Sequence, residues 1–93
     1  MEIKNRVIKQ TGKFYVEEEG EIKAELIYKF PSSPIMIIEH TEVNESLKGK
    51  NVGFQLVKRA VEYARENHLK IIPFCPYAKS VFEREKDFGD VLK

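Results

Sequence analysis

The sequence predicts an α/β fold of the α+β type, in which a mixed, mostly antiparallel sheet of about five strands is accompanied by two main helices. Three observations predict it. The first half of the chain alternates apolar and charged residues with the two-residue period of strands, and the second half changes to the 3.6-residue period of helices. A short apolar run follows the first helical segment, which is the order of a strand–helix–strand crossover.

Three hairpin-linked strands are expected before residue 31. The first ends at the turn signal Thr11-Gly12, and the second runs into the acidic turn 17–20. In the third, over 21–30, every second residue from position 22 is apolar, while mostly charged residues occupy the positions between. This alternation predicts a half-buried antiparallel strand.

The second half predicts a crossover. A fourth strand over 35–43 begins with a continuous apolar run, which favours a place at the centre of the sheet. After a polar loop, apolar residues recur at helical spacing over 52–67, and a short buried strand over 69–74 and a second helix over 77–85 follow. The unit from 35 to 74 is then a right-handed crossover that makes the fourth and fifth strands parallel.

The composition limits the classes of function. The 93 residues predict one domain, 1–93, and a hydrophobic fraction of 42% with 33% charged residues is typical of a globular rather than a disordered chain. The 16 basic and 15 acidic residues leave a net charge of +1, which provides no general field for nucleic acid or anionic lipid. We therefore expect no nucleic-acid partner, no membrane partner, and a monomer or weak dimer.

Signals for targeting and for metal binding are missing from the sequence. No apolar run approaches the roughly 18 to 20 residues that span a bilayer, and the first residues lack the apolar stretch of a signal peptide, so a cytoplasmic location is expected. The single cysteine, Cys75, has no partner for an internal disulfide. Because only His40 and His68 could join it as ligands, no metal site is predicted.

The loop 45–53 joins the fourth strand to the first turn of the long helix, where unpaired main-chain N–H groups and the helix dipole favour an anion. Gly49 and Gly53 leave room for close approach to the backbone, and Lys48 and Lys50 add positive charge. This spacing favours a phosphate site, and a lysine-bearing loop that only caps a helix is the common alternative. Neither a Walker loop nor a dinucleotide fingerprint is present.

The segment 47–57 resembles the acetyl-CoA loop of the GCN5-related N-acetyltransferase (GNAT) superfamily, whose pattern is Arg/Gln-x-x-Gly-x-Gly/Ala. Lys48 stands at the Arg/Gln position and keeps its charge, and Gly53 matches the second glycine. Asn51 replaces the first glycine, and asparagine tolerates the left-handed conformation of a tight loop. Further runs that are similar to the very short, single-domain GNAT-like proteins are 40–43, 62–67 and 70–82.

The resemblance implies that the fourth and fifth strands splay apart and leave a cleft for the pantetheine arm of acetyl-CoA, the cosubstrate. Backbone groups around 39–43 would pair with that arm, and the amides from Lys48 to Gly53 would hold the pyrophosphate. Tyr77 would pack beside the pantetheine or act as an acid, and ordinary packing is the alternative. The cofactor-binding residues expected on this basis are Glu42, Val43, Lys48, Gly49, Lys50, Asn51, Val52, Gly53 and Tyr77.

Acetyl transfer to an amine needs a base for the ammonium, donors for the thioester carbonyl and an acid for the departing thiolate. Larger GNAT enzymes often take the acid from a tyrosine in a pattern resembling Asn-x-x-Ala-x-x-x-Tyr, but here Cys75 stands at the asparagine and Phe82 at the tyrosine. Cys75, near a helix start that favours a thiolate, is therefore the catalytic candidate, as acyl acceptor or acid. A buried, inert cysteine is the alternative.

His40 is the second catalytic candidate, as the base, because the fourth strand can present its imidazole to the cleft. A histidine with only a structural place in the strand is the alternative. Glu39 or Glu42 could serve instead, since residues 40 and 42 share one face of a regular strand and residues 39 and 41 the other.

The expected function is transfer of an acetyl group from acetyl-CoA to an amine acceptor, either a small molecule or a protein, whose identity the sequence leaves open. Two alternatives belong to other classes. One is a non-catalytic CoA or acyl-CoA binding module, which the missing tyrosine favours. The other is a partner-binding domain whose open cleft takes a peptide by strand addition.

Overall fold

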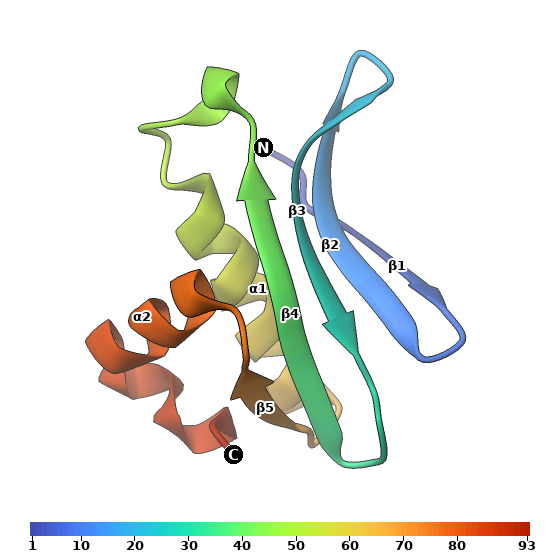
Figure 1. The fold of residues 1–93 in the computed structure, drawn as a ribbon, viewed down its shortest axis with the longest axis vertical. Coiled ribbons are helices and arrows are strands. Elements are labelled where there is room, and N and C mark those ends of the chain that lie inside the picture. Colours follow the sequence, from blue (N-terminus) through green and yellow to red (C-terminus); the bar gives the residue numbers. More distant parts are fainter.

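The computed structural model describes residues 1–93 and contains a five-stranded sheet with helices packed against one face (Figure 1). The strand order is β1-β2-β3-β4-β5, and every pair is antiparallel except the parallel pair β4–β5. The expected α+β fold with parallel fourth and fifth strands is therefore confirmed. The elements are β1 Lys4–Ile8, β2 Thr11–Glu18, β3 Glu21–Lys29, β4 Ile35–Val43, the 3-10 helix η1 Glu45–Leu47, α1 Val52–Glu66, β5 Lys70–Pro73, α2 Pro76–Arg84 and the 3-10 helix η2 Lys86–Val91.

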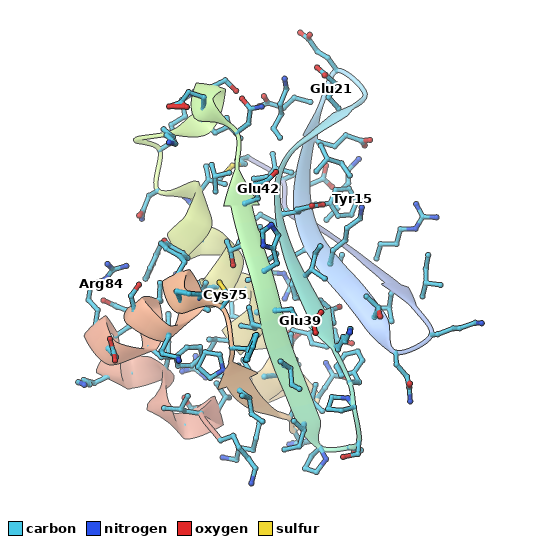
Figure 2. The ribbon with its side chains drawn as sticks, viewed as in Figure 1. Tyr15, Glu21, Glu39, Glu42, Cys75 and Arg84 are labelled. Carbon is cyan, nitrogen blue, oxygen red and sulfur yellow. The ribbon has the colours of Figure 1, made fainter.

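Alternate residues of β2 and β3 form the sheet side of the core. Phe14 and Val16 of β2 are buried, whereas Tyr15 between them lies on the other face, which we call the outer face (Figure 2). The helix α1 covers the buried face because its apolar residues recur at helical spacing. The residues that α1 buries are Val52, Leu56, Val57, Ala60, Val61 and Ala64.

The structure corrects the expected place of the fourth strand. β3 is in the middle of the sheet, and β4 lies between β3 and β5. The apolar run at the start of β4 was misleading because its residues divide between the two faces. Met36 and Ile38 are fully buried in the core, whereas Ile35 and Ile37 lie on the outer face and are partly exposed.

β4 contains one more residue than the part of β3 that it pairs with. Ile27 pairs with His40, and the next residue of β3, Tyr28, pairs with Ile38, so Glu39 has no residue opposite it. An extra residue of this kind is a β-bulge, and it moves the following side chains to the other face of the strand.

The bulge decides which side chains of β4 face the helices. Before it, Ile38 points inward and is fully buried; after it, Thr41 and Val43 point inward and are partly buried. His40 and Glu42 point outward and are exposed. Without the bulge, the inward positions would have been 40 and 42, because side chains alternate along a regular strand.

β5 separates from β4 halfway along its length. Ladder pairing joins Ile35–Ile38 of β4 to β5. The N–H groups of Phe74 and Cys75 then both donate to the carbonyl oxygen of Ile38, at 3.0 and 3.1 Å, before the chain enters α2. The edge of β4 that faces α2 therefore has no strand partner over residues 39–43.

Candidate active site

A cavity of about 290 Å³ lies between the free edge of β4, the loop before α1 and the start of α2. β4 and the start of α1 thus meet α2 at one place, as expected where the adjacent parallel strands β4 and β5 diverge. The residues that line the cavity are Thr41, Val43, Leu47, Lys48, Gly49, Asn51, Val52, Gly53 and Tyr77. Seven of the nine expected cofactor-binding residues are in this set.

 Of the expected residues, only Glu42 and Lys50 do not line it.

The start of α1 leaves a row of unpaired main-chain donors beside this cavity. The N–H groups of Gly49 and of residues 51–54 have no acceptor within the protein. Asn51, which precedes the helix, adopts the left-handed conformation (φ 60°), and its side chain makes no capping hydrogen bond. Unpaired N–H groups at a helix start attract an anion such as a phosphate.

The set of donors differs in part from the expected one. The amides of Lys48 and Lys50 are already used, because they donate to the carbonyl oxygens of Glu45 (3.1 Å) and Leu47 (3.3 Å). The donor row therefore consists of Gly49 and residues 51–54 rather than every amide from 48 to 53. Sequence reasoning missed the amide of Phe54, although the absence of partners for the first helical N–H groups is a general rule.

The two lysines of the loop add charge at its rim. The Nζ atom of Lys48 lies 3.3 Å from Oε1 of Glu45, and both side chains are exposed. This ion pair offsets part of the charge that Lys48 brings to the cavity, although exposed pairs of this kind are weak. Lys50 is exposed beside it.

Tyr77 closes the cavity on the side of α2. A Cβ atom placed on Gly53 would lie 3.0 Å from both Cζ and Oη of the Tyr77 ring. The ring thus lies against the backbone of the first turn of α1, close to the donor row, and it is 38% exposed. A Cβ atom here would make the ring shift, so the glycine at position 53 lets Tyr77 lie this close to the backbone.

Cys75 lies where β5 ends and α2 begins, between β4 and α2 (Figure 2). Its Sγ atom is the N-cap acceptor of α2, receiving the N–H of Ala78 at 3.5 Å. The same atom is 3.5 Å from Oγ1 of Thr41, a distance at which the thiol donates to the hydroxyl. Only 5% of Cys75 is exposed, so the thiol lies behind Thr41 rather than in the cavity wall.

The structure does not bring His40 and Cys75 together. His40 is on the outer face, where its Nε2 lies 3.5 Å from Oε2 of Glu42, and both side chains are exposed. Cys75 is on the helix side with Thr41. A catalytic role of His40 therefore stays a prediction, limited to a substrate that reaches the outer face.

Glu39 also departs from the expected alternation. Its carboxylate is 3.2 Å from Nζ of Lys29, an exposed residue of β3, so Glu39 points to the outer face and not to the face of Thr41. The bulge at Glu39 is the reason. Glu42 faces outward as well, and only its main chain belongs to the free edge of β4.

Thr41 is the site residue that sequence reasoning missed. One signal for it exists, because Ile38 and Val43 are both apolar but are five residues apart, and an odd spacing indicates a bulge between them. Ile35 and Ile37 concealed this signal because they are also apolar, so the start of the strand does not show which of its two faces is buried.

Phe82, at the position where larger GNAT enzymes often carry a tyrosine, is part of the core. It is 6% exposed, and its ring centroid is 6.1 Å from that of Phe88 in an edge-on arrangement. Phe82 offers no proton, so any acid of this site must come from elsewhere.

None of the helices is long and apolar enough to cross a membrane.

Comparison with known proteins relates the chain to acetyltransferases. Residues 13–91 match the family model described as GCN5-related N-acetyl-transferase. Protein NATD1 of Danio rerio is 33% identical over 71 residues, which are 76% of this chain and 64% of that protein. This chain therefore matches less than two thirds of the length of that relative.

Solved structures share the fold. A GCN5-like protein from Staphylococcus aureus is 41% identical, with a TM-score of 0.78 over 99% of this chain and 87% of that one. A protein from Clostridium acetobutylicum, solved with acetyl-CoA, has a TM-score of 0.63 at 15% identity, over 81% of this chain and 56% of that one. Because the family model matches most of the sequence, this protein belongs to the GCN5-related N-acetyltransferase family.

Proposed function

We propose that the protein transfers the acetyl group of acetyl-CoA to an amine acceptor. One observation carries the proposal: Gly49 and residues 51–53, whose amides are unpartnered, line a cavity that extends to Thr41, the neighbour of the only thiol. Family membership supports the same chemistry. The acceptor is a small amine or a protein amine, and the cofactor is acetyl-CoA as cosubstrate.

The coenzyme is proposed to lie along the cavity from α1 to β4. Its pyrophosphate takes the donor row at the start of α1, where the helix dipole favours negative charge. Its pantetheine arm runs beside Tyr77 and pairs with the main chain of Glu42 and Val43, because this edge of β4 has no strand partner. An extended amide chain that pairs with a free strand edge is a common mode of recognition.

The thioester is proposed to reach Cys75, and two routes are open there. In the acyl route, the Cys75 sulfur forms a bond to the carbonyl carbon, the bond to the coenzyme sulfur breaks, and the thiol proton ends on the coenzyme. The amine then forms the new C–N bond, Cys75 leaves as a thiolate, and the proton that the amine releases restores the thiol. In the acid route, the amine attacks acetyl-CoA directly and Cys75 protonates the departing coenzyme thiolate.

The acceptor side is proposed to be the outer face of β4. His40 and Glu42 lie there within 3.5 Å of each other, next to the free edge that the pantetheine would occupy. An amine that approaches from this face meets His40 as its base, while the coenzyme approaches from the helix side. His40→Gln should then lower kcat and leave the affinity for acetyl-CoA within about twofold of wild type.

Two measurements test the proposal. Titration with acetyl-CoA, followed by residue-resolved amide shifts, should move Gly49 and residues 51–54 and leave the β1–β2 hairpin unchanged. Mass spectrometry after incubation with acetyl-CoA should then show either one acetyl group on Cys75 that is lost when amines are added, or direct acetylation of an amine. Amides that do not move at saturating acetyl-CoA would overturn the assignment of the site.

A non-catalytic CoA or acyl-CoA binding module is the second candidate, favoured by the buried Phe82 at the position of the usual acid. It predicts the same amide shifts and the same gain in thermal stability with coenzyme, because both require only binding. It differs in chemistry: Cys75 stays unmodified, and no member of a broad amine panel is acetylated.

A further inference from the structure

Thr41 is the only side chain that both lines the cavity and contacts Cys75 through a hydrogen bond. It lines the cavity from β4, and its Oγ1 is 3.5 Å from the Cys75 sulfur, which itself is almost fully buried. This placement follows from the bulge at Glu39, which turns position 41 inward. A group bound in the cavity therefore meets the Thr41 hydroxyl, behind which the thiol lies.

We infer that Thr41 is a positioning residue for Cys75: its hydroxyl orients the thiol toward the cavity and donates a hydrogen bond to the sulfur when the sulfur is a thiolate. The inference rests on the proposed function, in which this sulfur reacts with acetyl-CoA or protonates the coenzyme. A threonine hydroxyl can both accept and donate, so it accepts the S–H of the thiol and reverses to donate to the thiolate.

The two partners of the sulfur suit a thiolate. The N–H of Ala78, at the start of α2, can only donate, and it already points at the sulfur from 3.5 Å. The Thr41 hydroxyl on β4 accepts from the thiol, and it would turn to become the second donor once the sulfur is a thiolate. Hydrogen bonds to a charged acceptor are stronger than those to a neutral one, so both contacts favour the form of the sulfur that attacks a thioester.

The same contact gives Thr41 a part in both routes of the proposed reaction. In the acyl route, the thiol must lose its proton as the sulfur bonds to the carbonyl carbon, and the hydroxyl stabilises the negative charge at that moment. In the acid route, the S–H bond turns from Thr41 toward the coenzyme sulfur, and the Thr41 hydroxyl then donates to the Cys75 sulfur and holds the side chain in that orientation. Thr41 forms no covalent bond and keeps its own proton in either case.

The alternative is that Thr41 only fills space in a strand that favours β-branched residues. Valine has the same branched shape and lacks the hydroxyl, and serine keeps the hydroxyl and lacks the methyl group. Thr41→Val and Thr41→Ser therefore separate the two accounts. Thr11→Val is the matched control, because Thr11 is exposed at the start of β2 and does not line this cavity.

The first readout uses the protein without coenzyme and needs no activity. Ultraviolet absorbance of the thiolate, followed against pH, should show the midpoint for Thr41→Val about one pH unit above wild type, which is a tenfold weaker preference for the thiolate. Thr41→Ser should return the midpoint close to wild type, and Thr11→Val should not move it. An unchanged midpoint in Thr41→Val, or equal midpoints in the valine and serine variants, overturns the inference.

The second readout uses acetyl-CoA. Thr41→Val should bind it within about twofold of wild type but acetylate Cys75, or turn over amine, about tenfold more slowly, with Thr41→Ser restoring most of the rate. If Cys75→Ala retains full activity, the proposed role of the thiol fails, and the absorbance readout still decides the contact. If Thr41→Val does not fold, Thr41→Ser compared with Thr41→Ala decides it in the same way.

Discussion

The ring of Tyr77 lies against the backbone of Gly53, so close that a Cβ atom on the glycine would be 3.0 Å from the phenol carbon and oxygen. This contact joins the first turn of α1 to the first turn of α2 and forms one wall of the cavity. A side chain at position 53 must displace the tyrosine or enter the space proposed for the coenzyme.

Gly53→Leu should therefore weaken acetyl-CoA binding by about 100-fold, or about 3 kcal/mol, while the protein stays folded. Position 53 has ordinary helical geometry, so the added side chain causes crowding rather than backbone strain. Isothermal titration calorimetry gives the affinity, and circular dichroism gives the fold. Gly89→Leu is the control, because nothing lies within 4 Å of a Cβ atom at Gly89. Binding of Gly53→Leu at wild-type strength would show that the coenzyme lies elsewhere.

Cys75→Ala should keep acetyl-CoA binding within about twofold and remove acetyl transfer. The sulfur is also the N-cap acceptor of α2, so the variant should lose about 1 kcal/mol of stability. Cys75→Ser keeps a capping oxygen and should recover stability without recovering the rate. The measurements are coenzyme affinity, initial rate and chemical denaturation, and undiminished transfer in Cys75→Ala would make the thiol a bystander.

Lys50→Gln should weaken coenzyme binding about fivefold at low salt, with a smaller effect at high salt, because an exposed charge beside a phosphate acts through a screened field. Lys9→Gln removes the same charge in the β1–β2 turn and should change little. Affinities at two salt concentrations check this. Equal salt dependence in Lys50→Gln and wild type would mean that the loop lysine does not face the phosphates.

Tyr28 should make the protein sensitive to alkaline pH. Burial raises the pKa of Tyr28 from 10.0 to about 12, and neighbouring Tyr63 adds to the shift. The unfolded chain thus loses this proton at a lower pH than the folded chain, so stability that is present below pH 10.0 is lost as the pH rises toward about 12. The loss should reach up to about 2 kcal/mol.

Tyr28→Phe is the test of this assignment. The variant loses the 2.6 Å hydrogen bond from Tyr28 to Oδ1 of Asn5 and should be about 1 kcal/mol less stable at neutral pH. The free energy of unfolding of the variant should fall less at alkaline pH than that of wild type, because the buried titrating group is gone. Urea denaturation at a series of pH values measures both, and parallel curves would assign the alkaline decline to other groups.

The sequence predicted the element order, the crossover and the place of the loop before α1, because these depend on local signals. The change of period after Asn51, the glycines of the loop and the alternation of β3 each act within a few residues. Cys75 was also expected at the junction of β5 and α2, since Pro76 ends the strand and starts the helix.

The expected faces of β4 failed because they depend on the register between strands, which the residues of one strand indicate only weakly. The bulge at Glu39 is established only when β4 is paired with β3, because Ile35 and Ile37 obscure the odd spacing of Ile38 and Val43 that indicates it. It separates His40 from Cys75 and brings Thr41 into the cavity wall. The use of the Lys48 and Lys50 amides by their own loop also depends on a turn geometry that residue types do not determine.

The extra residue in β4 has a consequence for how this strand tolerates change in length. Relative to a regular strand of the same sequence, every side chain beyond the bulge lies on the opposite face of the sheet. A chain lacking Glu39 would pair as a regular strand and would still turn His40 outward and Thr41 inward, because Ile38 and His40 already lie opposite consecutive residues of β3. β4 can therefore lose one residue at the bulge and keep the same side chains at the cavity.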